Sequence, residues 1–327
     1  MRATVLEVLT EFDAHLLNEL QYNFPLTLTP FKDIAERLDV SENKVLQRTR
    51  ELLEQRIIKR IGFTVNYKSQ GKVAALVGVR ATSRDEVEKL KNVLLKNPEV
   101  THNYLRDDPD YQVWFTIKAK TLEDLKNDVK DILEPLGFTK YIILPSKKVC
   151  KVSVKYDLIR GIAWSPPAPQ RDRVPRPEEL GLPKELPKAV SRLKVVSRPY
   201  KEIAEKFNMS EGELLDKVKL MLEHNILRNP GASIDGDKVG FKYNVMVVMN
   251  VDNDIEVCKK IAENVWEASH VVAREVPPEW PYPVYFVLHA MRKEPVEEVI
   301  QKVVDEFRPI DYRSLYSIEN LKPGIAR

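Results

Sequence analysis

Two histidine–arginine pairs with the same spacing are the residues of this chain that are best suited to chemistry. His102 precedes Arg106 by four positions, and His270 precedes Arg274 by four. Arginine stays charged at any accessible pH and grips a carboxylate through two parallel hydrogen bonds. Histidine gives or takes a proton near neutral pH. The combination suits a substrate with several carboxylates and a reaction that needs a delivered proton. Decarboxylation is one such reaction, because the carbon that CO2 leaves behind must be protonated.

Aromatic residues near both pairs are candidates for the wall of a pocket for a large flat ligand. They are Tyr104, Trp114, Trp280, Tyr282 and Tyr285. His289 ends the apolar segment after the second pair, and Lys118 stands at the corresponding place in the first half. The alternatives are structural: a histidine beside an arginine on a strand is commonly a surface or interface pair, and the segment "PPEWPYP" also suits a rigid turn.

The pairs belong to a chain that contains an internal sequence repeat. Residues 198–241 overlay residues 29–73, with Pro30 opposite Pro199 and Gly62 opposite Gly231 at an offset of 169. A repeat of this length is too long for a solenoid. We interpret the chain as two homologous subunits fused into one.

Each half begins with a helical part. Residues 31–38 form a short amphipathic pattern, and Ser41 is placed to cap a second helix that reaches about residue 54. Ser210 and Glu213 make a full capping box in the second half. The pattern is that of a winged helix-turn-helix, with residues 57–63 as the first wing strand.

Each half continues with an α/β part. In the first half the pattern predicts strands near 73–80, 99–106, 111–119 and 140–144, and helices near 84–96 and 121–134. The order β-α-β-β-α-β is ferredoxin-like, and the second half repeats it from residue 243 to about 316. Within a strand, positions i and i+4 project from the same face, so each histidine lies beside its arginine. The alternating segment 147–157 predicts an added edge strand.

The expected fold class is therefore α+β, in two tandem repeats of a winged helix-turn-helix followed by a ferredoxin-like domain, with the sheets of the two repeats packed together. The expected divisions are 1–66 and 188–236 for the winged helices, 67–157 and 237–327 for the αβ domains, and 158–187 for an extended, semi-rigid linker rich in proline and charge.

Composition describes a globular protein of 327 residues with 43% hydrophobic and 31% charged residues. The chain has no apolar run long enough for a membrane span, and its N-terminus lacks the pattern of a signal peptide, so we expect the cytoplasm. Cys150 and Cys258 lie 108 positions apart, outside any metal-binding motif. We expect two partly buried thiols, no disulfide scaffold and no metal site.

Charge argues against DNA binding by the helix-turn-helix. The net charge is +3, and the second helix of each helical part balances to zero over residues 41–54 and to −2 over residues 210–223. An acidic helix is repelled from the phosphates of the major groove. We expect these helices to be scaffold. Few glycines and no phosphate-binding loop also make nucleotide chemistry improbable.

The quoted motifs resemble those of siroheme decarboxylases in the Lrp/AsnC-like family, with both subunit types fused. "YNFPLTLTPFKDIAERL", "IIKRIGF", "THNYLR" and "VWFT" resemble one subunit, and "SRPYKEIAEKF", "ASHVVAR", "EWPYPVYFVLHA" and "LYSIENLK" resemble the other. The resemblance covers nearly everything outside the linker. The His-x-x-x-Arg pairs and the segment with WPY carry it, because ordinary Lrp/AsnC regulators lack them.

The resemblance implies a carbon–carbon lyase that removes the carboxyl groups of the C12 and C18 acetates of siroheme, on an alternative route to haem or towards haem d1. No cofactor is expected beyond the tetrapyrrole and its iron. Siroheme and its mono- and didecarboxylated forms are the expected ligands, the two halves are expected to pair, and a further homodimer stays open. His102 and His270 are the expected catalytic residues, and the expected substrate-binding residues are Arg106, Arg274, Tyr104, Trp114, Trp280, Tyr282 and His289. The alternative function is a ligand-responsive transcription regulator.

Overall fold

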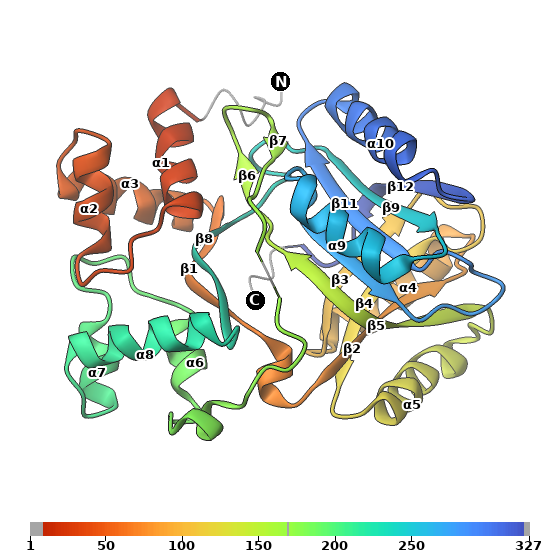
Figure 1. The fold of residues 1–327 in the computed structure, drawn as a ribbon, viewed down its shortest axis with the longest axis horizontal. Helices are drawn as coiled ribbons and strands as arrows, with labels where there is room; N and C mark the ends of the chain where they lie inside the picture. Colours follow the sequence, from red (N-terminus) through yellow and green to blue (C-terminus); the bar gives the residue numbers. More distant parts are fainter. Residues whose placement is uncertain (1–8, 169, 324–327) are drawn as a thin grey trace.

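The computed structural model describes residues 9–168 and 170–323. Residues 1–8, which belong to the N-terminal segment considered for a signal peptide, lie outside this part. The winged-helix units of both halves lie at one end of the molecule and the two αβ domains at the other (Figure 1). None of the helices in the described ranges is long and apolar enough to cross a membrane.

The two helical units share one apolar core. Their helices are α1 (Glu11–Tyr22), α2 (Pro30–Arg37) and α3 (Glu42–Glu54) in the first half, and α6 (Leu186–Val190), α7 (Lys201–Lys206) and α8 (Glu211–Glu223) in the second. The Ser210–Glu213 capping box is present at the start of α8, and the Ser41 side chain accepts from the Lys44 N–H at the start of α3. Both N-cap predictions are confirmed. Leu17 and Phe31 from the first half and Tyr200 and Met221 from the second all lie in one buried cluster.

The wing strands pair across the two halves. Strand β1 (Ile58–Val65) runs antiparallel to β8 (Leu227–Ile234), and Gly62 meets Gly231 at the centre of the ladder. A Cβ atom at Gly231 would lie 2.0 Å from the Leu20 carbonyl oxygen, and one at Gly62 would lie 2.3 Å from that of Ser191. The repeated glycines therefore let β1 and β8 pass close to the helical units.

Each αβ domain has the predicted order of elements. The first contains β2 (Val73–Val79), α4 (Arg84–Lys96), β3 (Val100–Arg106), β4 (Val113–Ala119), α5 (Leu122–Leu133) and β5 (Tyr141–Val152). The second contains β9 (Tyr243–Asn250), α9 (Asp254–Asn264), β10 (His270–Arg274), β11 (Val284–Ala290), α10 (Lys293–Phe307) and β12 (Asp311–Asn320). The ferredoxin-like prediction is confirmed for both halves.

The two sheets join at both edges into a closed ring. Its order is β5-β2-β4-β3 from the first half, then β12-β9-β11-β10 from the second, and β10 pairs with β5 to close it. We call the β10–β5 and β12–β3 pairings the two seams, because each joins a strand of one half to a strand of the other. Their registers match: Arg274 stands opposite Ser146 in the first, and the equivalent Arg106 stands opposite Ser317 in the second. The order reads the same from either half, as a pseudo-two-fold axis requires. Closure leaves neither sheet with an open edge at the seams.

The prediction of an added edge strand over residues 147–157 is wrong. Residues up to Val152 continue β5, and there they pair with β10 of the second half. Residues Tyr156–Asp157 form a separate short strand, β6, which pairs with β7 (Ile162–Ala163). The alternating pattern showed that the segment is extended, but the first half alone could not show that the second half supplies its neighbour.

Apolar clusters fix the ring from outside and inside. Helices α4 and α5 cover the first sheet, and α9 and α10 cover the second (Figure 1). Inside the ring, a third cluster fills one end, with Trp114, Trp280, Tyr285 and Leu315 among its members. The other end faces β1 and β8, and this end holds the cavity described below.

A pair of buried lysines shows how closely the halves match. Lys151 Nζ donates to the Val265 carbonyl at the end of α9 (3.4 Å), and Lys322 Nζ donates to the Asn97 carbonyl at the end of α4 (2.7 Å). A cation at a helix C-terminus satisfies unpaired carbonyl groups and complements the helix dipole. These lysines therefore hold equivalent helix ends in both halves.

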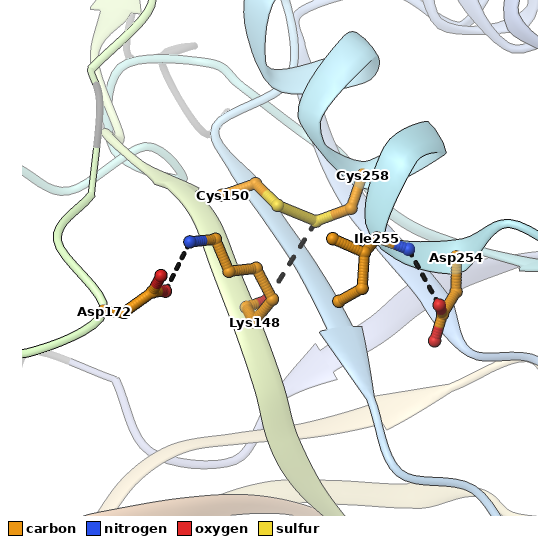
Figure 2. The surroundings of a disulfide bond; sticks show 6 residues. All are labelled: Lys148, Cys150, Asp172, Asp254, Ile255 and Cys258. Atoms are coloured by element: carbon orange, nitrogen blue, oxygen red, sulfur yellow. Dashed lines mark hydrogen bonds and ion pairs between the residues drawn. A yellow bond between two sulfur atoms is a disulfide. The ribbon is translucent and has the colours of Figure 1, made fainter.

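The two cysteines form a disulfide, which corrects the expectation of two thiols. Cys150 on β5 and Cys258 on α9 have Cα atoms 6.1 Å apart and are bonded (Figure 2). Separation in sequence hid this, because the contact exists only where α9 of the second half packs over β5 of the first. At the equivalent places stand Leu321, directly after β12, and Leu90 on α4, both in one apolar cluster. Only one seam in the described chain thus carries a covalent link.

The segment expected to be a linker is packed against the molecule. Strand β7 pairs with β11 through Ile162 and Ala290, and the Ser165 N–H donates to the Trp266 carbonyl at 2.7 Å. Val174 and Leu182 are buried in the core of the helical units. The segment therefore helps to hold the two halves together, and the expectation of an extended spacer is wrong.

Candidate active site

One cavity of about 380 Å³ lies between the ring and the β1–β8 pair. Its lining comes from both halves, including β3 and β4 of the first and β9, β10 and β11 of the second. Pockets of this size commonly hold small molecules or cofactors. The two halves therefore build a shared site rather than one site each.

The two candidate catalytic histidines meet in this cavity. His102 on β3 and His270 on β10 have ring centroids 6.2 Å apart, with the rings nearly perpendicular at 80°. Each lies on a strand that reaches the seam with the other half. The spacing seen twice in the sequence thus becomes one pair of facing imidazoles.

Arg106 is buried and Arg274 is half-buried, and both donate to neutral oxygens. Arg106 donates to the Leu315 carbonyl (2.9 Å) and to Asn244 Oδ1 (3.2 Å). Arg274 donates to the Leu144 carbonyl (3.2 Å) and to Ser146 Oγ (3.3 Å). Within the described ranges neither arginine forms an ion pair with a carboxylate, and Arg274 Nε is buried without a hydrogen-bond partner.

Burial lowers the pKa of both guanidinium groups, that of Arg106 to about 10. A buried cation without an anionic partner is costly, so a bound carboxylate would relieve it at either position. The tyrosine rings of Tyr104 and Tyr285 lie 4.9 Å and 5.2 Å from the guanidinium carbons of Arg106 and Arg274. These cation–π contacts help to hold the arginines in place.

Further basic residues that sequence analysis missed line the same cavity. They are Lys59, Arg60, Lys118, Arg228 and Lys322, against the two carboxylates of Asp235 and Asp237. The ammonium group of Lys322 donates to carbonyl groups at the end of α4, and Arg60 donates to Thr64 Oγ1 and to the Ser191 carbonyl. Lys59 and Arg228 occupy equivalent places on β1 and β8, so the repeat itself was the signal that could have found them. The site is strongly cationic and suits a ligand with many carboxylates.

His289 also lines the cavity. It lies on β11 beside Tyr156, with ring centroids 5.4 Å apart. Burial, then His270, Arg106 and Lys59, lowers its pKa to about 3. For His270, burial followed by the nearby Arg228 and Arg274 lowers the pKa to about 4. Both imidazoles are therefore neutral at neutral pH in the protein without ligand.

Tyr104 and Trp114 line the cavity, whereas Trp280 and Tyr282 lie behind its wall. Trp280 Nε1 donates to Tyr285 Oη at 2.7 Å, and its ring centroid is 5.3 Å from that of Trp114. Tyr282 accepts from Arg313 Nε at 3.0 Å and donates to Asp311. In the protein without ligand, the WPY segment packs inside the ring and supports the wall residues, so substrate contact by Trp280 and Tyr282 stays a prediction.

The basic residues of the first recognition-type helix are engaged within the chain. Arg48 forms ion pairs with Asp13 and Glu51, both at 2.7 Å, and Arg50 Nε donates to the Val195 carbonyl at 3.0 Å. Free cationic side chains are what a DNA-binding helix needs. The geometry therefore favours the scaffold interpretation of α3.

The described residues hold no group of three or more His, Cys, Asp or Glu side chains that could bind a metal ion. The cavity residues instead offer guanidinium, ammonium and imidazole groups. This donor set fits the carboxylates of an organic ligand.

The fold and the cavity define a class of double-repeat proteins with AsnC-like ligand-binding domains. The family model for the AsnC-like ligand binding domain matches residues 71–151 and 238–322. The family model for the siroheme decarboxylase NirDL-like HTH domain matches residues 13–59 and 191–228. Both models match once in each half, which confirms the tandem repeat.

Three similar proteins show which members of this class the chain resembles. The siroheme decarboxylase NirDL subunit of Paracoccus pantotrophus is 27% identical over 94% of both chains. The siroheme decarboxylase beta subunit of Oleidesulfovibrio alaskensis is 35% identical over 38% of this chain and 80% of its own length. A crystal structure of the siroheme decarboxylase NirDL in complex with an iron-uroporphyrin III analogue matches with a TM-score of 0.62 and 25% identity, over 96% of this chain and 92% of that chain. The chain belongs to the siroheme decarboxylase family, as the sequence motifs indicated.

Proposed function

We propose that this chain is a carbon–carbon lyase that removes the carboxyl groups of the C12 and C18 acetates of siroheme and yields 12,18-didecarboxysiroheme. The observation that carries the proposal is the shared cationic cavity in which two histidines and two arginines, one from each half in both cases, converge. Siroheme presents carboxylates around a flat apolar macrocycle, and its family relatives bear the name of this activity. The product belongs to an alternative route to haem or haem d1.

The proposed chemistry uses groups that the cavity supplies. Arg106 and Arg274 bind substrate carboxylates, since within the described residues the hydrogen bonds of both go to neutral oxygens and burial lowers the pKa of both. The bond between the acetate methylene carbon and its carboxylate carbon breaks, and CO2 leaves. The electron pair stays on the methylene carbon, where the macrocycle delocalises it, and a proton from His102 or His270 completes the methyl group. No cofactor besides the substrate tetrapyrrole enters this proposal.

Incubation with siroheme under anaerobic conditions tests the activity. We expect masses that fall by one and then two CO2 units, together with a shifted Soret band on binding. Absence of both decarboxylated products would refute the proposal. A gel-shift assay with DNA from upstream of the gene tests the alternative of a transcription regulator, and a specific shift that siroheme reverses would favour that alternative.

A further inference from the structure

The side chains of Arg106 and Arg274 both reach across a seam into the other half. Arg106, on β3, donates to the Leu315 carbonyl of β12 at 2.9 Å. Arg274, on β10, donates at 3.2 Å to the Leu144 carbonyl, which has the equivalent place on β5. The next strand beyond is β9 in the first case and β2 in the second. The two guanidinium groups therefore approach equivalent places in opposite halves.

These two places present different residues. Asn244 is the second residue of β9, and Ala74 is the second residue of β2. Asn244 Oδ1 accepts a hydrogen bond from Arg106 Nη2 at 3.2 Å. The methyl group of Ala74 offers no acceptor, and Arg274 donates to Ser146 Oγ on β5 at 3.3 Å instead. The side chain of Arg106 is thus tied to the second strand beyond its own, and that of Arg274 is tied to the neighbouring strand.

The bond to Asn244 places the Arg106 guanidinium beside other groups of the cavity. Asn244 lines the cavity and stands opposite His289 in the β9–β11 ladder. Burial, then His270 and Arg106, lower the pKa of His289, so the guanidinium lies near that ring. The Tyr104 ring centroid lies 4.9 Å from the guanidinium carbon. Burial raises the pKa of the Tyr104 phenol, and a hydrogen bond from the Asn244 amide opposes that rise.

An amide at this position holds Arg106 without satisfying its charge. A guanidinium only donates hydrogen bonds, so the oxygen of the Asn244 amide must face it. A neutral oxygen fixes the direction of the guanidinium and leaves its positive charge to attract a carboxylate. An aspartate has the same shape, but it would form an ion pair with Arg106 and compete with the ligand.

We propose that Asn244 is a positioning residue, which holds the guanidinium of Arg106 in the direction from which it binds a carboxylate of the substrate. This inference rests on the proposed function. Asn244 acts through Arg106 and takes no part in the transfer of the proton. The equivalent Ala74 gives Arg274 no such support, and Arg274 is half-buried whereas Arg106 is buried.

The test compares the unmodified protein with Asn244→Asp, Asn244→Ala, Arg106→Gln and the double variant Arg106→Gln with Asn244→Ala. Asn92→Asp is the matched control, because Asn92 is exposed on α4 and the change adds the same charge outside the cavity. Siroheme binding is followed by Soret titration, and turnover at saturating siroheme is followed by product mass. The melting temperature is measured on the protein without ligand.

Asn244→Asp should bind siroheme about tenfold or more weakly, because the new carboxylate pairs with Arg106. Its melting temperature should equal or exceed that of the unmodified protein, and its rate at saturating siroheme should stay within about threefold. Asn92→Asp should match the unmodified protein in all three measurements. A purely structural role of Asn244 would leave the affinity of Asn244→Asp unchanged, because aspartate still accepts from Arg106.

Asn244→Ala should bind siroheme about threefold to tenfold more weakly in the unmodified background. In the Arg106→Gln background the same change should alter affinity by less than about twofold, because residues that act through one contact are not additive. Equal losses in both backgrounds would show that Asn244 does not act through Arg106 and would overturn the proposal.

Two further outcomes would also overturn it: an affinity of Asn244→Asp equal to that of Asn92→Asp, or weaker binding by Asn244→Asp together with a lower melting temperature. If the unmodified protein decarboxylates siroheme while either outcome is found, this inference alone fails. If the unmodified protein gives no decarboxylated product, the proposed function fails.

Discussion

At the scale of single residues, His270, one of the two proposed proton donors, is neutral before substrate binds. Burial, Arg228 and Arg274 hold the pKa of His270 at about 4. Siroheme carboxylates would neutralise those two cations and so raise this pKa. The proton would then be taken up with the substrate, and the imidazolium would exist only when there is something to protonate.

Binding should therefore be linked to proton uptake. The complex holds more protons than the free protein, so affinity should rise as pH falls through the pKa of bound His270 and should level off near the free value of about 4. Calorimetry near pH 6.5, in two buffers of different ionisation enthalpy, should give about one proton taken up per siroheme or less. His270→Gln should lose most of this uptake. Proton release on binding would contradict the argument.

Substitution of the motif residues should separate chemistry from binding. His270→Ala should bind siroheme but decarboxylate it about 100- to 10,000-fold more slowly, because a general acid is lost. Arg274→Ala should first weaken binding, because its guanidinium faces no carboxylate in the described protein. Comparison with His102→Ala, by mass of mono- and didecarboxylated products, assigns each histidine. Unchanged rates in both histidine variants would mean that the pair is structural.

At the scale of elements, the two seams of the ring are built alike but secured differently. The β5–β10 seam carries the disulfide and an ion pair between Lys147 and Asp254 at 2.8 Å. The β3–β12 seam has Leu321 and Leu90 at the places of the cysteines, and its Glu319 forms ion pairs with Arg84 and Lys91. The covalent link therefore stabilises the seam next to His270.

Reduction of the disulfide should lower the free energy of unfolding by about 2–4 kcal/mol, since the bond closes a long loop in the unfolded chain. Thiol titration of the denatured, unreduced protein should find no free cysteine, and reduced protein should melt earlier. The double variant Cys150→Leu and Cys258→Leu, which copies the other seam, is the control and should not respond to reductant. Two titratable thiols in unreduced protein would show that the bond does not form.

The wing strands depend on their paired glycines. Gly231→Ala should destabilise the protein by about 3 kcal/mol or more, because the new Cβ would collide with the Leu20 carbonyl and φ is +112°. Gly212→Ala on α8 is the control, since the nearest atom to its Cβ is 4.0 Å away. That change should be neutral or stabilising by about 0.5–1 kcal/mol. Equal melting temperatures for the two variants would contradict the predicted close approach.

Local patterns were enough to predict the elements but not their partners. The helix at 84–96 and the strands that carry His102 and His270 follow from periodicity and caps, and they agree with the structure. The β5–β10 pairing, the disulfide and the inward packing of Trp280 depend on contacts between halves. Lys59 and Arg228 carry no local signal, because an isolated basic residue on a strand looks like any solvated charge.

At the scale of the molecule, the two halves form a single site. Both histidine–arginine pairs line one cavity, and the imidazoles are too close for two macrocycles to bind side by side. Siroheme titration should therefore reach an endpoint at one ligand per chain. Equilibrium dialysis with the iron content measured independently checks this number. An endpoint of two would mean that each half binds its own macrocycle.

Because the two repeats are fused in one chain, a substitution can alter one half of the cavity and leave the other half unchanged. In a dimer of identical subunits, each substitution alters the cavity at two related places at once. Here Asp237 and Lys68, or His289 and Lys118, occupy related places but are encoded separately. An engineer can therefore reshape one wall of the pocket while the opposite wall keeps its original chemistry, and natural drift has had the same freedom.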